Sequence, residues 1–128
     1  MRDPMTIYPV LPASDLDRAR AFYRDKLGLE ATMVKPGVLC YSGPSGYIFQ
    51  LYETSTPPSG HTQMSWACDE LDAEMAALRA RGVVFEDVDV FGVRTDNGVG
   101  WLGSERHAWF KDSEGNMICI WQPETARG

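Results

Sequence analysis

The sequence predicts an α+β fold in which one β-α-β-β-β module occurs twice within a single domain of 128 residues. The first observation is a weak internal repeat, because Leu16 and Asp17 recur at a constant separation as Leu71 and Asp72, near the start of a second amphipathic stretch. The second observation is a polar segment rich in proline and glycine, residues 54–60, near the middle of the chain. A duplicated module often shares one site between its halves, so equivalent positions are the candidates for function.

The first module is predicted to cover about residues 5–53. Its first strand, at 5–12, contains two prolines, which favour a sheet edge. Ser14 is predicted to cap the helix that follows, in which apolar residues recur at helical spacing as far as Leu27, and Gly28 is a suitable C-terminal residue. Three short strands are then predicted at about 29–34, 38–42 and 47–53.

The second module, at about 62–122, is predicted to repeat this order after a linker at 54–61. Its middle strand is indistinct and is located only loosely, around 94–101, within a glycine-rich stretch at 91–105. The other elements are predicted as a strand at 62–67, a helix at about 70–81, a strand near 83–87, and strands at 106–111 and 117–122.

Composition excludes several classes of partner. A formal net charge of −6 argues against nucleic acid and anionic membrane surfaces, since both require a basic surface. No stretch approaches the roughly 18 to 20 apolar residues of a spanning helix, and the N-terminus lacks the apolar core of a signal peptide. Three cysteines, with no closely spaced pair, indicate neither a disulfide framework nor a zinc knuckle. The cytosol is therefore the expected location.

Two segments resemble the vicinal oxygen chelate superfamily, which includes glyoxalase I, extradiol dioxygenases, fosfomycin-resistance proteins and bleomycin-binding proteins. Residues 14–29 (Ser-Asp-Leu-Asp-Arg-Ala-Arg-Ala-Phe-Tyr-Arg-Asp-Lys-Leu-Gly-Leu) are similar to its first helix. Residues 108–116 (Ala-Trp-Phe-Lys-Asp-Ser-Glu-Gly-Asn) are similar to its closing hairpin, although Ser113 replaces the usual proline. The resemblance implies that the curled sheets of the two modules form one open cup, commonly completed in a homodimer.

Metal enzymes of that superfamily hold a divalent ion with side chains from the first and last strands of each module. The resemblance maps these positions onto Tyr8, Gln50, Gln63 and Cys119. The set contains no carboxylate and no imidazole, the groups that hard and borderline cations prefer, and one thiolate with two amides would be a weak zinc site. We therefore predict no metal and no other cofactor.

Two histidines keep the alternative of a metal site open. His61 lies two residues before Gln63, and His107 lies on the predicted strand of Trp109 with the same parity. The ordinary interpretation is that His61 is exposed at the end of the linker and that His107 makes a simple hydrogen bond.

Strand alternation predicts what lines the cup if Cys119 faces into it. Phe110, Ile118 and Ile120 would then face the helices, together with Trp66. Trp101, within the glycine-rich stretch, is predicted either to close over a ligand or to form a dimer contact. The alternative for the other aromatic side chains is simple core packing. The predicted ligand-binding residues are Tyr8, Gln50, Tyr52, Gln63, Ser65, Trp101, His107, Trp109, Met117, Cys119 and Trp121.

Flat aromatic walls with a few neutral hydrogen-bonding groups suit an extended aromatic ligand and do not suit a phosphate. The sequence thus predicts a metal-free homodimer that sequesters a bulky aromatic molecule such as an antibiotic, without catalytic residues. The first alternative is an enzyme of the same superfamily, a lyase, isomerase or dioxygenase. The second is a stress-associated or regulatory protein that binds a common metabolite. A nucleophilic Cys119 is less expected than an inert buried thiol.

Overall fold

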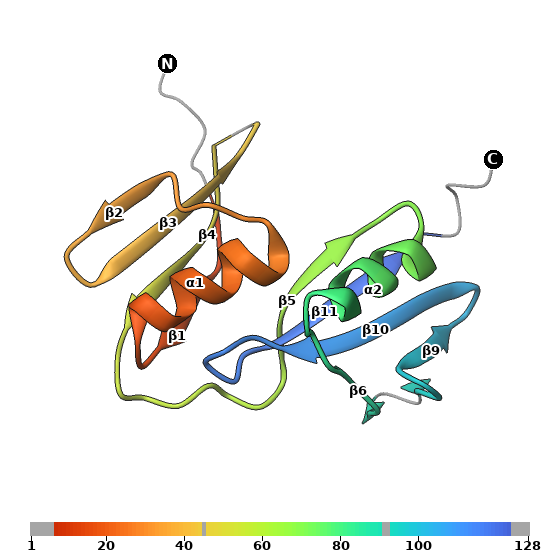
Figure 1. Cartoon of the computed structure of the whole chain (residues 1–128). Helices are drawn as coiled ribbons and strands as arrows, with labels where there is room; N and C mark the ends of the chain where they lie inside the picture. The colour runs from red at the N-terminus through yellow and green to blue at the C-terminus, as the bar shows by residue number, and fades with distance from the viewer. Residues whose placement is uncertain (1–6, 45, 91–92, 124–128) are drawn as a thin grey trace, which may run out of the picture. The chain divides into compact units, whose positions relative to one another are not determined.

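The computed structural model describes residues 7–44, 46–90 and 93–123 (Figure 1). The chain divides into two compact units. Unit 1 consists of residues 1–59 together with 113–116, and unit 2 consists of residues 60–112 together with 117–128. No helix among the described residues is long and apolar enough to cross a membrane.

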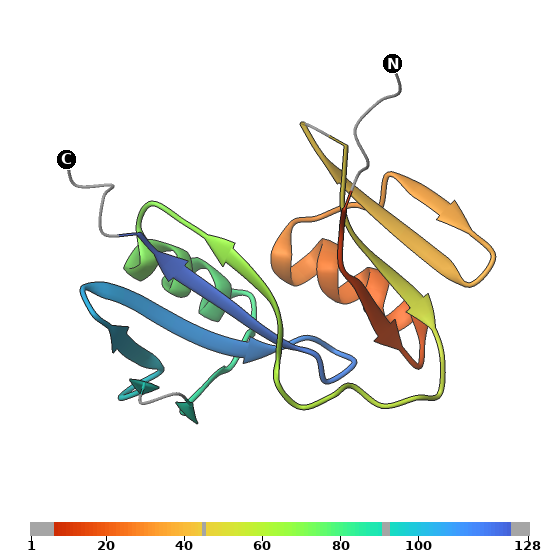
Figure 2. The same ribbon diagram turned by 180° about the vertical axis from the view of Figure 1, so that it is seen from behind.

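Unit 1 contains a four-stranded sheet in the order β1-β4-β3-β2, in which only the pairing of β1 with β4 is parallel. Helix α1 (Leu16–Leu27) packs on one face of this sheet, and the view from behind shows the opposite face (Figure 2). The strands are β1 (Val10–Ala13), β2 (Met33–Lys35), β3 (Val38–Gly43) and β4 (Gly46–Glu53).

Aromatic side chains form the core of unit 1 between α1 and its sheet. Tyr23 of α1 is buried, and its ring lies 5.6 Å from Tyr41 and 5.5 Å from Phe49. Tyr41 and Phe49 are stacked across β3 and β4 at 4.5 Å. This close ring packing fixes the helix against the sheet, because aromatic side chains bury a large apolar area.

The start of α1 differs from the prediction that Ser14 caps it. Asp15 is the N-cap, in an extended conformation, and its Oδ1 accepts a hydrogen bond from the backbone N–H of Arg18. Ser14 instead donates through its backbone N–H and its hydroxyl to Glu114. The end of the helix is as predicted, since Gly28 has the left-handed conformation (φ 73°) that ends many helices.

Unit 2 contains a five-stranded sheet with the order β5-β11-β10-β6, in which β9 also pairs with β10. Helix α2 (Leu71–Ala80) packs on one face, with Leu71, Met75 and Leu78 buried. A separate two-stranded sheet joins β7 to β8. The strands are β5 (Thr62–Ala67), β6 (Phe85–Glu86), β7 (Asp89–Val90), β8 (Val93–Arg94), β9 (Val99–Leu102), β10 (Glu105–Lys111) and β11 (Met117–Gln122).

The indistinct middle strand of the second module is in fact two short strands, β8 and β9. A two-residue turn, Asn97 and Gly98, separates them, and both residues have positive φ (55° and 86°). Such Asn-Gly turns are typical of tight β-hairpins. Asp87 and Thr95 hold the neighbouring segment through side-chain hydrogen bonds, in place of a regular strand ladder.

Several strands are shorter than predicted. The strand predicted at 5–12 begins at Val10, and residues 5 and 6 lie outside the described residues. The strand predicted at 29–34 covers only Met33–Lys35, and the one near 83–87 covers only Phe85–Glu86. The α+β class and the two helices are confirmed.

Gly100 in β9 is closely packed, and its replacement provides a test of this region. A Cβ at this position would come within 2.6 Å of Val93 Cγ1 and 3.2 Å of Thr95 Cγ2. We expect Gly100→Ala to lower the free energy of unfolding by about 1–3 kcal/mol, the usual cost of overpacking. Denaturant unfolding measures this change. In the double variant with Val93→Ala the two losses should be less than additive, and full additivity would contradict the proposed clash.

Candidate functional site

The candidate site lies on the face of the unit 2 sheet opposite α2 (Figure 2). In the antiparallel pair β10–β11, Trp109 is paired with Cys119 and His107 with Trp121. Their neighbours in alternation, among them Phe110, are buried on the α2 side, where Trp66 packs against Phe110 as predicted. Alternation along two strands therefore brings aromatic and thiol side chains to one face.

Three rings on this face form what we call the aromatic ladder: His107, Trp109 and Trp121. The imidazole of His107 is nearly parallel to both indoles, with centroid distances of 5.8 Å to Trp109 and 5.5 Å to Trp121. Trp109 follows His107 by two residues on β10, and Trp121 lies directly across on β11. The ladder is thus a stack of three rings contributed by two adjacent strands, with the two indoles on either side of the imidazole.

Trp109 is the anchored member of the ladder. Its side chain is buried, and its indole N–H donates to Thr62 Oγ1 at 3.0 Å. It forms a buried cluster with Val93 and Cys119, against which Val88, Met117 and Trp121 pack. Trp121 is only partly buried. The ladder is therefore held by the core at Trp109 and open at Trp121.

Cys119 has polar partners that sequence reasoning missed. Its Sγ lies 3.6 Å from Nδ1 of His107, and Nε2 of the same imidazole lies 3.3 Å from Oε1 of Glu105. Ser65, paired with Cys119 across β5 and β11, also hydrogen-bonds to the sulfur. Burial raises the pKa of the Cys119 thiol to about 11. The resting sulfur is therefore protonated and is oriented toward an imidazole nitrogen.

Gln63 lies where the strand pairing is irregular. The register between β5 and β11 shifts between Met117 and Ile118, so Thr62, not Gln63, meets Trp109. Gln63 is half-buried, and its Oε1 is buried with no hydrogen-bond partner among the described residues.

In unit 1 the sheet face opposite α1 carries the other predicted site residues. Gln50 donates from Nε2 to Tyr8 Oη at 3.4 Å and to Cys40 Sγ at 3.3 Å. The Tyr8 ring makes an edge contact with Tyr47 at 5.5 Å. Tyr52 is exposed on β4. Tyr8 and Gln50 thus belong to one hydrogen-bonded group within unit 1.

Trp101 does not lie on the sheet face that carries the ladder. The register of β9 with β10 pairs Trp101 with Arg106, whereas His107 is paired with Gly100. Trp101 therefore faces the α2 side, where the Arg106 guanidinium lies 6.0 Å from its ring and also pairs with Asp72 of α2. Its side chain is 60% exposed.

The fold and these positions match one protein family. A family model described as the Glyoxalase/Bleomycin resistance protein/Dioxygenase superfamily matches residues 7–120. The chain belongs to this superfamily. This confirms the resemblance in the first helix and the closing hairpin, and the fold that it implies for each module.

Solved structures of superfamily members resemble the chain over nearly its whole length. TnmS3, an antibiotic binding protein from Streptomyces sp. CB03234, is 26% identical, with a TM-score of 0.68 and coverage of 97% of this chain and 99% of that one. A lactoylglutathione lyase from Agrobacterium tumefaciens is 19% identical, with a TM-score of 0.67 and coverage of 97% and 98%. A superfamily protein from Alicyclobacillus acidocaldarius is 17% identical, with a TM-score of 0.71 and coverage of 99% and 98%. A search of curated proteins found no match.

The residues at the superfamily's metal positions do not fit a divalent ion. Within unit 1, the Gln50 amide donates to Tyr8 and Cys40, and within unit 2 the residues at these positions are an amide, Gln63, and a buried thiol, Cys119. Among the described residues, no group of three or more His, Cys, Asp or Glu side chains is arranged to hold a metal. His61 is exposed, with Nδ1 2.9 Å from the Thr62 carbonyl oxygen. The donor set therefore supports no step through a metal.

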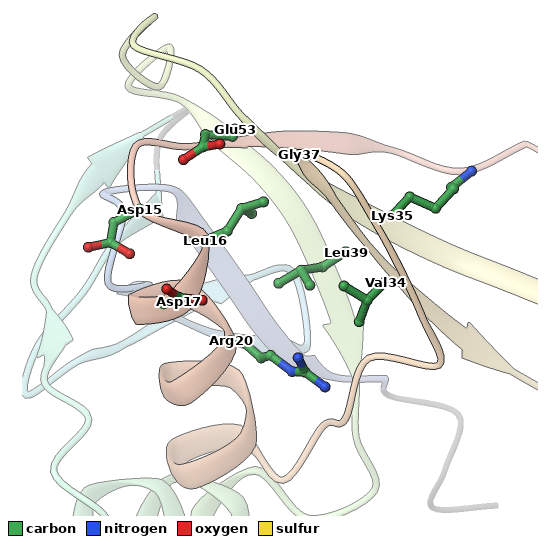
Figure 3. A pocket seen from close by; sticks show the side chains of 9 residues that line it. All are labelled: Asp15, Leu16, Asp17, Arg20, Val34, Lys35, Gly37, Leu39 and Glu53. Atoms are coloured by element: carbon green, nitrogen blue, oxygen red, sulfur yellow. The ribbon is translucent and has the colours of Figure 1, made fainter.

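A separate cavity of about 290 Å³ lies in unit 1 between α1 and the strands that follow it (Figure 3). Its lining combines acidic and basic side chains with a few apolar ones. The lining residues are Asp15, Leu16, Asp17, Arg20, Val34, Lys35, Gly37, Leu39 and Glu53. This lining is unlike the aromatic ladder, and no predicted site residue belongs to it.

Proposed function

We propose that this superfamily member is a metal-free cytosolic binding protein that sequesters a bulky, largely aromatic small molecule. The observation that carries the proposal is the aromatic ladder of His107, Trp109 and Trp121. A stack of parallel rings can be extended by another flat ring system at its open end, and aromatic pairs contribute about 0.5–1.5 kcal/mol beyond their area burial.

Neutral polar groups around the ladder support the same ligand class. Ser65 is exposed beside the ladder and offers a hydroxyl, whereas Lys111, on the same face, already pairs with Glu86 at 3.8 Å. A phosphate or polyanion would need convergent Arg or Lys side chains. A neutral, conjugated ligand oriented by a few hydrogen bonds is a better match.

The similarity to TnmS3 supports an antibiotic as the ligand, since that relative is described as antibiotic-binding and shares 26% identity with this chain. Sequestration would hold such a molecule away from its target and release no product. The alternative is an enzyme of the superfamily, in line with the fold that the chain shares with a lactoylglutathione lyase.

Metal analysis and ligand titration test the proposal. Protein purified without chelator is expected to contain far less than one equivalent of any transition metal. The reason is that the residues at the four mapped metal positions include neither a carboxylate nor an imidazole. A planar aromatic compound is then expected to quench tryptophan emission in a saturable manner. A stoichiometric metal, or a chemically altered ligand released into solution with turnover, would move the protein into the enzyme class.

We further propose that the protein forms a homodimer. Unit 1 exposes apolar side chains on the sheet face opposite α1, among them Val10, Ile48 and Tyr52. A face of this kind is often covered by another subunit. Light scattering should give twice the 14.3 kDa mass of the chain, and a monomer at micromolar concentration would contradict the proposal.

A further inference from the structure

The thiol of Cys119 has neighbours that an inert core cysteine does not need. The sulfur lies between the Ser65 hydroxyl on one neighbouring strand and the His107 imidazole on the other. The other nitrogen of this imidazole, Nε2, lies within hydrogen-bond distance of the Glu105 carboxylate. The Glu105 side chain is 37% exposed, whereas that of His107 is only 13% exposed. A thiol, an imidazole and a carboxylate in this order form the usual arrangement of an activated nucleophile.

We propose that Cys119 is a covalent capture site for aromatic compounds that carry a conjugated, electrophilic double bond, with His107 as the proton acceptor and Glu105 as its positioning residue. The inference rests on the proposed function, because stacking on the ladder is what brings the electrophile to the sulfur. The ligand class is an α,β-unsaturated carbonyl compound attached to a flat ring system.

The hydrogen-bond pattern defines the starting state. For the thiol to donate to Nδ1 of His107, the imidazole must carry its own proton on Nε2, which then donates to Glu105. Proton transfer from Sγ to Nδ1 would create a thiolate and an imidazolium. Ser65 stabilises the thiolate by hydrogen bonding, and Glu105 stabilises the imidazolium.

Addition of the Cys119 thiol to the double bond requires no reactant other than the protein and the ligand. A bond forms between Sγ and the β-carbon of the unsaturated carbonyl compound, and the π electrons of the double bond move to the α-carbon. The proton on Nδ1 of His107 then passes to the α-carbon, which restores the neutral imidazole. Nothing is oxidised or reduced, and there is no leaving group.

Burial gives the site its selectivity. Cys119 is only 3% exposed, so a small polar reagent in water rarely meets the sulfur. Met117, an unbranched and adaptable side chain, is among the residues that pack against the cluster of Cys119. A ring stacked on Trp121 can displace Met117 and approach the sulfur from the open end of the ladder.

The other cysteines lack this arrangement. Cys40 contacts the Gln50 amide, which is not a base. Cys68 is partly exposed, but its pKa is raised by burial and by the nearby carboxylates of Glu74 and Asp69. Cys68 is therefore the background site, and the Cys68→Ser variant removes it.

The test uses the full chain with Cys68→Ser and a matched pair of reagents, N-(1-naphthyl)maleimide and N-methylmaleimide. Intact-protein mass spectrometry follows the rate of adduct formation, and peptide mapping locates it. We expect one adduct at Cys119, formed at least about tenfold faster by the naphthyl reagent, and none with Cys119→Ser. His107→Gln is expected to slow the reaction at pH 7 by about tenfold or more, as for loss of a general base, and Glu105→Gln by less.

The pH profile distinguishes a base from a structural residue. Between about pH 6 and pH 8.5, where maleimides remain intact, the reaction of His107→Gln should accelerate more steeply with pH than that of the wild type, because its thiol must ionise without a base. A ratio of the two rates that is the same at every pH, no adduct at Cys119, or a rate that is independent of His107 would overturn the proposal.

The saturated analogue N-(1-naphthyl)succinimide separates this inference from the proposed function. It cannot form the adduct, so calorimetry with it measures binding alone. If the protein binds the succinimide but Cys119 remains unmodified after maleimide treatment, covalent capture is refuted and sequestration still stands. An adduct that depends on His107, without succinimide binding, would support the activated thiol and count against the aromatic binding surface.

Discussion

Replacing Glu114 with glutamine is expected to lower the free energy of unfolding by about 2–4 kcal/mol, because the side chain is a buried, multiply bonded carboxylate. Its side chain is 1% exposed, and Oε1 accepts from the backbone N–H groups of Ser14 and Asp15 as well as from the Ser14 hydroxyl. Arg18 donates to both carboxylate oxygens, at 2.8 and 2.9 Å. Glutamine keeps the shape but replaces one acceptor oxygen with an N–H donor that faces other donors.

The turn at Ser113–Asn116, which belongs to unit 1, is held to the start of α1 by these bonds. Ser113 donates its hydroxyl to Glu114 Oε2 at 2.8 Å, a bond that a proline could not make. Asn116 is fully buried and donates to the Pro12 carbonyl oxygen. The departure from the family's usual proline therefore adds a donor to the Glu114 carboxylate.

The same carboxylate predicts a dependence of stability on pH. Hydrogen bonds from Arg18, Ser113 and Asp15 outweigh burial and lower the pKa of Glu114 from 4.5 to about 2. A lowered folded-state pKa contributes stability above the unfolded value, and the contribution is lost as pH falls toward 2. The difference between the wild type and Glu114→Gln should accordingly shrink between about pH 5 and pH 2.

Glu53→Gln is the matched control, since Glu53 is an exposed carboxylate in the same unit. We expect its effect to stay within about 0.5 kcal/mol at all pH values, as for most surface substitutions. Urea unfolding at several pH values measures both variants. Equal effects of the two substitutions would show that the Glu114 network does not stabilise unit 1.

Replacing Trp121 with alanine is expected to weaken binding of a planar aromatic ligand by about 1–3 kcal/mol, which corresponds to roughly 5- to 150-fold in Kd. Trp121 is the partly exposed end of the ladder and stacks on His107 at 5.5 Å. Its loss removes the surface on which a ligand ring would rest. Trp109→Ala should weaken binding to a similar extent, and it should also destabilise the protein because Trp109 is buried.

Trp101→Ala provides the control for the tryptophan variants. Trp101 has the same side chain but faces the α2 side of the sheet and is 60% exposed. Its replacement should leave affinity unchanged in a titration followed by calorimetry. Weaker binding in Trp101→Ala with no change in Trp121→Ala would place the ligand on the opposite face of the sheet.

Much of the fold could be predicted because it depends on local patterns. Periodic apolar residues located both helices, and Gly28 marked the end of the first. The Asn97–Gly98 turn is also a local signal, and it could have divided the predicted middle strand. Local sequence could not show whether Ser14 or Asp15 is the N-cap, since Ser14 hydrogen-bonds to Glu114, 100 residues away.

The site was predicted less completely, because it depends on contacts between residues that are distant in the sequence. Alternation correctly brought His107, Trp109, Cys119 and Trp121 to one face. The pairing of Trp101 with Arg106 and the register shift beside Gln63 depend on inter-strand hydrogen bonds, which no local pattern specifies. The contacts of His107 with Cys119 and Glu105 likewise depend on the register of β10 against β11, which brings His107 close to the sulfur.

The sequence by itself determined the α+β class, the position of both helices and the aromatic character of one sheet face. These properties follow from composition and periodicity, which act along the chain. Only the tertiary structure decided which side chains meet: the Glu114 carboxylate with the start of α1, Thr62 with Trp109, and the Cys119 thiol with His107. Strand register and irregular pairings set these contacts, because a shift of one residue moves a side chain to the other face.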